Sequence, residues 1–265
     1  MSASSNRPSA QPSDSAAAPL TDIVDEARRL HSAALEEGLP IRLIGGLAVR
    51  IRAGDQIHPS LSREYGDIDF VTLKDRGKAA VEFFSEMRYR PDREFNAFNG
   101  GTRLLFHDPA NARQIDVFLG AFRMCHEIPF ADRITLHPST VPLAELLLTK
   151  LQIVSLNEKD LRDAIAILHH HDLADHDEDA INGARVAHLC AADWGLWRTC
   201  TMNLERIRDG VQLYNLTEQQ QAVVGRRIDR LRERIDAEPK TRGWRLRDRI
   251  GDRKRWYDEP EDLPT

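Results

Sequence analysis

The sequence predicts an α+β fold, with strands and helices mixed in the first half of the chain and helices alone in the second half. Before Pro142, short apolar runs bounded by Gly, Pro, Asn and Asp lie between segments of helical periodicity, which is typical of a sheet covered by helices. After Pro142, apolar residues recur at helical spacing as far as Ile235. The 265 residues are enough for one large domain or two modest ones.

The first half contains all the predicted strands. Thr21 can cap a helix that ends before Gly38, and the strand that follows stops at Gly45-Gly46. The turn residues of 107–111 reverse the chain, so the strands on either side of them should form a hairpin. The predicted helices cover residues 21–37, 47–52 and 75–87, and the predicted strands cover residues 41–44, 65–71, 102–106 and 113–119.

The second half is predicted to be helical. Five carboxylates within residues 172–179 favour an exposed linker, and the three histidines of 169–171 favour a solvated helix end. The predicted helices cover residues 143–156, 158–170, 182–189, 194–209 and 217–235. We therefore divide the chain into a disordered leader (1–20), a sheet-containing core (21–140), a helical domain (141–237) and a basic, then acidic tail that can be flexible (238–265).

Composition and charge indicate a soluble protein of the cytoplasm. The net charge of -5 gives no overall attraction to nucleic acid, and three widely spaced cysteines fit reduced thiols. No run reaches the roughly 18 apolar residues of a membrane helix, so no membrane partner is expected. Residues 226–257 carry thirteen Lys and Arg against six Asp and Glu. This basic run could face RNA with its aromatic residues, although a salt-bridged helix and tail is the favoured interpretation.

Asp67 and Asp69 are the pair of residues that best predicts chemistry. They open an apolar strand, and residues two apart in a strand point to the same face of the sheet. Two carboxylates held close together repel each other, which raises one pKa unless a cation neutralises them. Mg²⁺ prefers one or two carboxylates together with phosphate oxygens and water. The pair therefore predicts a divalent metal site.

Gly45-Gly46 and Asp116 complete the predicted site. The glycines lie between a strand and a short helix, where backbone amides can approach a phosphate closely. Asp116 lies in the returning strand of the hairpin and can come to lie beside the earlier pair. Three carboxylates around one or two metal ions suit the transfer of a nucleotidyl group, with Asp116 as the base for the acceptor hydroxyl.

This set of motifs resembles the nucleotidyltransferase superfamily related to DNA polymerase β. The pattern is Gly45-Gly46, then Asp67-Ile68-Asp69, then Asp116 in a later strand. The closest likeness is to the AbiEii-type enzymes, which include toxins of bacterial toxin–antitoxin pairs. It rests on three further features, namely Arg63 four residues before the first Asp, the Leu-rich helix with Lys in Leu146-Leu147-Leu148-Thr149-Lys150-Leu151, and Lys159-Asp160-Leu161-Arg162-Asp163.

The resemblance implies a polymerase-β-like nucleotidyltransferase core, an NTP substrate and Mg²⁺ (or Mn²⁺) held by the three aspartates. It further implies that Lys150 and Arg63 contact the nucleotide and that Asp160 is an active-site carboxylate, with Asp163 as the alternative. The acceptor stays open between a tRNA 3′ end, a protein hydroxyl and a small molecule such as an aminoglycoside, and an antitoxin protein is a possible partner. The rival hypothesis is a non-catalytic module that binds a nucleotide or a partner on the same fold.

Overall fold

A mixed sheet lies at the centre of the first half of the chain. The structure is a computed structural model that describes residues 18–130 and 132–259, so most of the predicted leader lies outside the described residues. The sheet has five strands in the order β1-β2-β5-β4-β3. Their bounds are Arg42–Ile44 (β1), Asp67–Thr72 (β2), Arg90–Pro91 (β3), Arg103–Asp108 (β4) and Arg113–Leu119 (β5).

The pairing of β2 with β5 is parallel, and the other neighbouring pairs of this sheet are antiparallel. Parallel strands need a crossover connection. Here the chain leaves β2, passes through α3 (Gly77–Glu86), β3 and α4 (Arg93–Asn99), and returns through the β4–β5 hairpin. The predicted hairpin is therefore confirmed, and it is this crossover that places β5 beside β2.

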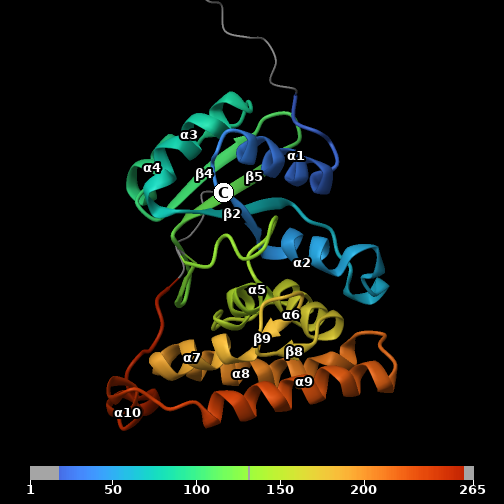
Figure 1. The fold of residues 1–265 in the computed structure, drawn as a ribbon, viewed down its shortest axis with the longest axis vertical. Coiled ribbons are helices and arrows are strands. Elements are labelled where there is room, and N and C mark those ends of the chain that lie inside the picture. Colours follow the sequence, from blue (N-terminus) through green and yellow to red (C-terminus); the bar gives the residue numbers. More distant parts are fainter. Residues whose placement is uncertain (1–17, 131, 260–265) are drawn as a thin grey trace, which may run out of the picture.

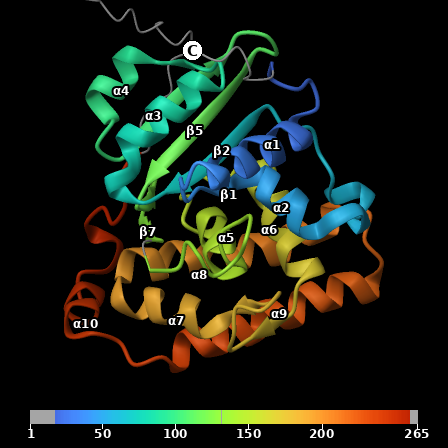
Figure 2. The same ribbon diagram turned by 45° about the horizontal axis from the view of Figure 1, so that its top comes forward.

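Helices cover both faces of the sheet, as Figures 1 and 2 show. Helix α1 (Ile23–Glu36) lies with α3 and α4 on one side, and α2 (Gly45–Ala53) and α5 (Leu143–Leu151) lie on the other side. The remaining helices lie below the sheet in Figure 1, with α6 (Glu158–His170) beside α5 and in contact with α2. The others are α7 (Gly183–Ala192), α8 (Trp194–Gly210), α9 (Glu218–Ala237) and α10 (Arg242–Asp248). This arrangement confirms the predicted fold class, a mixed sheet with flanking helices followed by a helical region.

The apolar face of the sheet packs against α3 through aromatic side chains. The Phe84 ring lies 5.9 Å from the Phe70 ring and 4.9 Å from the Phe106 ring, measured between centroids. Ile68 and Phe70 are fully buried there. Because side chains alternate along a strand, Asp67 and Asp69 project to the opposite face, toward α2 and α6.

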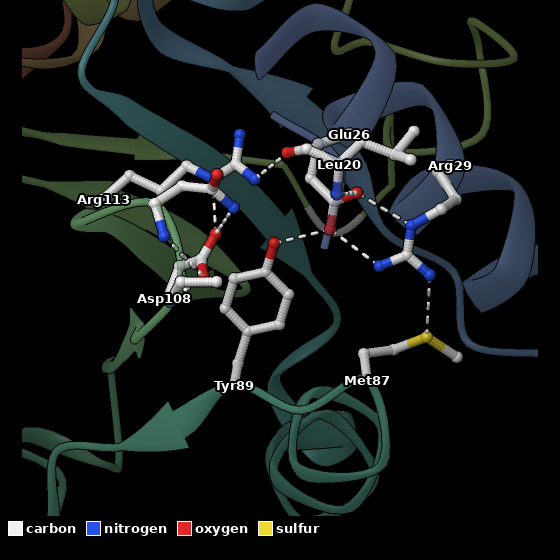
Figure 3. Close-up of polar contacts among 9 residues, drawn as sticks. Leu20, Glu26, Arg29, Met87, Tyr89, Asp108 and Arg113 are labelled. Atoms are coloured by element: carbon white, nitrogen blue, oxygen red, sulfur yellow. Dashed lines mark hydrogen bonds and ion pairs between the residues drawn. The ribbon is translucent and has the colours of Figure 1, made fainter. Parts of the chain in front are cut away.

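A buried carboxylate holds α1 to this side of the sheet. Glu26 is fully buried, and it accepts hydrogen bonds from Arg29, from the Tyr89 hydroxyl and from the Leu20 amide (Figure 3). Burial alone would raise the pKa of Glu26, but these donors outweigh it and the pKa lies below its usual value. Asp22, rather than the predicted Thr21, caps α1 by accepting from two amides of its first turn.

Several local features differ from the sequence prediction. Helix α5 ends at Leu151 instead of residue 156, because the Asn203 side-chain amide donates to the Leu151 and Ile153 carbonyls that would continue the helix. Four of the five carboxylates of 172–179 are exposed as predicted, whereas Asp177 is half-buried and pairs with Arg133 in contact with buried Glu145. Strand β8 (Leu173–Ala174) lies within this segment and pairs in parallel with β9 (Ile181–Asn182), which follows it. A second small hairpin joins β6 (Ala121–Arg123) and β7 (Glu127–Pro129).

The predicted solvated end of α6 is also wrong. His171 is buried, and the His169 ring lies 6.0 Å from the ring of His58. His58 belongs to the loop that leads from α2 to β2, so the histidines help to hold that loop on α6. Among the described residues, none of the helices is both long and apolar enough to cross a membrane.

Candidate active site

Asp69 and Asp116 lie directly opposite each other in the register of the parallel strands β2 and β5. Asp67 is two positions earlier on β2 and pairs with Gln114. Both strands therefore present their carboxylates on the face of the sheet that is turned away from α3. The structure brings together the three aspartates that the sequence singled out.

Gly45 places the start of α2 against Asp69. Its φ is +68°, in the left-handed region, and a Cβ at this position would collide with Asp69 Oδ2. Ile44 at the N-cap provides no side-chain hydrogen bond, so the first amides of α2 lack a side-chain acceptor. A helix N-terminus with unsatisfied amides favours an anion. The glycine allows this positive end to lie beside the carboxylates.

The carboxylates lack sufficient compensating charge. Burial, followed by the charges of Asp116 and Asp67, raises the pKa of Asp69 to about 7, although Lys150 and Arg103 act in the opposite direction. The pKa of Asp67 is also raised, first by burial and then by the charge of Asp116. A bound cation would remove this repulsion.

Lys150 and Arg63 converge on Asp163. The Lys150 ammonium lies 2.9 Å from Asp163 Oδ2 and 3.0 Å from Asp160 Oδ1. The Arg63 guanidinium makes a two-point contact with Asp163 at 2.9 and 3.0 Å and stacks on Tyr65, 4.5 Å from the ring centroid. Burial would raise the pKa of Asp163, but Lys150 and Arg63 outweigh it and the pKa is lowered. Asp163 thus anchors both cations, whereas Asp160 remains more exposed.

A cavity of about 150 Å³ joins these groups. Gly46 belongs to its wall, and a Cβ there would collide with the Arg63 guanidinium, so the second glycine admits Arg63 to the start of α2. Asn157 and Lys159 form the opposite lip from the beginning of α6. The lining residues are Gly46, Leu47, Arg63, Tyr65, Gly66, Asp67, Asp69, Asn157, Lys159 and Asp160. Lys150 and Asp116 lie outside this lining.

The donor set fits a metal ion that is shared with a ligand. As the side chains stand, no three His, Cys, Asp or Glu residues in the described part of the chain are gathered closely enough to hold an ion alone. Asp67 and Asp69 are two carboxylates on one strand, and the pKa of each is raised, first by burial and then by the charge of Asp116. Two carboxylates are the number that Mg²⁺ takes when phosphate oxygens and water complete its shell.

Arg103 is a site residue that the sequence analysis missed. Its Nε donates to Asp116 Oδ1 at 2.7 Å, and both side chains are buried. Arg103 and Asp116 lie on neighbouring strands but are diagonal rather than opposite in register, since Arg103 pairs with Phe118. A charged residue at the start of an apolar strand was the only signal in the sequence. Asp116 therefore lies between Asp69 on one side and Arg103 on the other.

Part of the basic C-terminal run is paired or packed, and most of residues 241–255 are exposed. Arg227, Arg232 and Arg234 of α9 form ion pairs with Asp172, Glu205 and Asp175. The Trp244 ring packs edge-on against Trp197, at 5.0 Å between centroids. These contacts agree with the salt-bridged helix that the sequence favoured.

No family model matches the chain, and no curated protein matches it. The solved structures that are similar to this chain include the following two. One is the antibiotic-resistance factor ANT(2'')-Ia, at a TM-score of 0.39 and 14% identity over 54% of this chain and 81% of that chain. The other is an antigenic nucleotidyltransferase-like protein from Paracoccidioides brasiliensis, at a TM-score of 0.39 and 13% identity over 83% of this chain and 94% of that chain. At this low similarity neither structure supports a functional argument. The functional argument rests on the geometry of the site itself.

Proposed function

We propose that this protein is a nucleotidyltransferase that transfers an NMP group from an NTP to an acceptor and releases pyrophosphate. The observation that carries the proposal is the pairing of Asp69 with Asp116 beside the amino end of α2. Aspartates side by side on a sheet, next to unsatisfied helix amides, suit a triphosphate and a metal ion together. The sequence pattern of Gly45-Gly46, Asp67, Asp69 and Asp116 gives independent support.

Each residue then has a chemical role. Asp67 and Asp69, with Asp116 as a further ligand, would hold Mg²⁺ or Mn²⁺, which would supply positive charge to the phosphates. The amides at Gly45 and Gly46 would donate to phosphate oxygens. Asp116 would accept the proton of the acceptor hydroxyl. At the same time the hydroxyl oxygen would bond to the α-phosphorus, and the bond from the α-phosphorus to pyrophosphate would break.

The cations around the cavity would contact the triphosphate. Arg63 lines the cavity and would contact the phosphates directly. Asp160 also lines the cavity and would be a further active-site carboxylate. Lys150 lies behind Asp160, so a phosphate contact would require its ion pair with Asp160 to open. In the resting arrangement Asp163 keeps Lys150 and Arg63 charged and in place.

The experiment is to incubate the protein with each labelled NTP and Mg²⁺, with and without total RNA, and to measure pyrophosphate. We expect release with at least one NTP, and loss of release in Asp69→Asn. Asp55→Asn is the matched control, because Asp55 is a fully exposed carboxylate outside the site. Absence of release with every NTP and acceptor would favour the rival, a non-catalytic nucleotide- or partner-binding module.

The resemblance to AbiEii-type enzymes supports a finer proposal, a cytoplasmic toxin whose partner is an antitoxin protein and whose acceptor is RNA, such as a tRNA 3′ end. Inducible expression in a bacterial host should then arrest growth, and the Asp69→Asn variant should not. Mass spectrometry of RNA and protein after incubation with mixed NTPs would identify the acceptor. Normal growth at full expression of the active protein would contradict the toxin assignment.

A further inference from the structure

A second cavity lies beside Arg103, the residue that donates to Asp116. Across one face of the sheet the order is α2 with Gly45, then Asp69 on β2, Asp116 on β5 and Arg103 on β4. In the proposed reaction the triphosphate lies at the glycine end and Asp116 takes the proton of the acceptor. The acceptor must therefore approach from the side of Arg103.

Arg103 is built to present its guanidinium on that side. Only 6% of the residue is exposed, and its guanidinium lies 4.9 Å from the Phe118 ring centroid and 5.6 Å from that of Phe95. Within the described residues, one hydrogen bond, from Nε to Asp116, uses its donors. A guanidinium has five N–H donors, so its terminal nitrogens remain for a ligand.

A cavity of about 220 Å³ adjoins Arg103. Arg123 lies on the same wall, and it is half-exposed in an ion pair with Glu127. Phe118 and Met124 give this wall an apolar part. Planar guanidinium groups recognise phosphate oxygens by two-point contacts, and two of them line this one cavity.

The chain's own C-terminal segment, residues 254–259, reaches this cavity. Trp256 anchors it by donating to Thr199 Oγ1 at 3.1 Å, and Gly195 leaves room for the Trp256 carbonyl. Asp258 and Glu259 then line the cavity. Glu259 pairs with Arg255 at 2.8 Å, and among the described residues neither carboxylate pairs with Arg103 or Arg123. The carboxylates face the two arginines without saturating them.

We propose that this second cavity is the acceptor subsite and that Arg103 and Arg123 bind a phosphate group of the acceptor, in competition with Asp258 and Glu259. The inference rests on the proposed function, which assigns the triphosphate to the side of Gly45 and the acceptor to the side of Arg103. It selects among acceptors, because the two guanidinium groups bind a phosphate-bearing molecule, whereas a polycationic aminoglycoside would pair with Asp258 and Glu259 instead. The phosphate can belong to an RNA 3′ end or to a small phosphorylated sugar.

The test measures binding without NTP or metal, so that it does not depend on catalysis. The probes are a fluorescently labelled single-stranded oligoribonucleotide with a free 3′ hydroxyl, ribose 5-phosphate as its competitor, and kanamycin. In Arg123→Gln, whose half-exposed side chain is not needed for folding, we expect the Kd for a phosphate probe to rise about tenfold. Arg103→Lys should weaken binding as well, since lysine retains the positive charge but cannot make the two-point contact of a guanidinium. The Asp258→Asn/Glu259→Gln double variant should bind more tightly.

Arg28→Gln is the matched control, because Arg28 is an exposed arginine on α1. Binding of the oligoribonucleotide alone assigns an RNA acceptor, and equal binding of ribose 5-phosphate assigns a small phosphorylated one. The proposal is overturned if neither phosphate probe binds the native protein, if the arginine variants bind as the control does, or if only kanamycin binds. Altered binding in the expected directions, with no pyrophosphate release under any condition, would retain the subsite and reject the transfer reaction.

Discussion

Asp69 on β2 and Asp116 on β5 occupy directly opposed positions although 47 residues separate them in the chain. Parallel pairing sets both side chains on the same face of the sheet at the same height. Burial, followed by the negative charge of Asp116, raises the pKa of Asp69 to about 7. A site with this stored repulsion should respond strongly to a divalent cation.

Mg²⁺ should stabilise the native protein and should not stabilise Asp69→Asn. At about ten times the dissociation constant, binding to the folded state alone adds about 1.4 kcal/mol, a rise of roughly 2–3 °C in Tm. Thermal unfolding with and without Mg²⁺ checks this, with Asp55→Asn as the control for non-specific ion effects. An unchanged Mg²⁺ response in Asp69→Asn would remove Asp69 from the metal site.

Gly45→Ala should be more destabilising than Gly38→Ala. Both glycines have positive φ, +68° and +71°, so each substitution costs about 1–2 kcal/mol in backbone strain. A Cβ at Gly38 meets no atom within 4 Å, whereas one at Gly45 collides with Asp69. Urea unfolding of both variants isolates the collision as the difference between them. Equal losses would mean that Asp69 moves away without cost.

Asp163→Asn and Asp160→Asn should separate a structural carboxylate from a functional one. Asp163 is almost fully buried between Lys150 and Arg63, and breaking such an arrangement costs about 3–5 kcal/mol. Asp160 is more exposed, so its loss should cost about 1 kcal/mol or less. Chemical denaturation measures the free energy of unfolding of each variant, and an NTP-binding titration measures its affinity for the nucleotide. A larger stability loss in Asp160→Asn than in Asp163→Asn would reverse the two assignments.

Acid should destabilise the fold through neutral histidines. Burial, followed by the nearby charges of Arg52 and Arg42, lowers the pKa of His137 to about 4, and His137 Nδ1 accepts from the Thr140 amide at 3.1 Å. Burial also lowers the pKa of His170 and of His171 to about 4. Because the unfolded chain binds these protons first, their full contribution is present above about pH 6.5 and is lost as the pH falls toward 4.

The loss should be on the order of 2 kcal/mol for each histidine over that interval, and protonation of Asp69, whose pKa is raised to about 7, offsets part of the total. Urea unfolding at pH 7.5, 6 and 5 measures it. In His137→Asn an amide oxygen can replace Nδ1 as the acceptor without titrating, so this variant should lose less stability on acidification. A flat profile for the native protein between pH 7 and 5 would contradict the prediction.

Tyr89→Phe should cost about 1–2 kcal/mol, because it removes a donor from fully buried Glu26 (Figure 3). Tyr214→Phe is the matched control. Its hydroxyl donates to Glu158, which is well exposed and can turn to water instead. Both stabilities come from urea titrations. A cost for Tyr214→Phe equal to that for Tyr89→Phe would indicate that burial of the acceptor is unimportant.

The sequence was informative where local signals agree. Helix α6 has the predicted bounds because Asn157 caps it and its apolar positions are periodic. Asp67 and Asp69 could be placed on one face because strand alternation is a local rule. Asp160 and Asp163 lie three apart on one helix face, and only the approach of Arg63 distinguishes them. The role of Arg103 depends on its diagonal contact with Asp116 across the β4–β5 hairpin. No pattern of residues in the sequence defines the register of that hairpin.

The contact of Arg63 with Asp163 joins residues that are 100 positions apart, across the cavity that Gly46 opens. During synthesis, every proposed metal ligand therefore leaves the ribosome well before α6, which supplies Asn157, Lys159 and Asp160 to the cavity. A nascent chain or a proteolytic fragment that ends before Asn157 carries the aspartates but lacks one wall of the cavity. Activity should accordingly appear in one step, when α6 docks, instead of growing with the length of the chain.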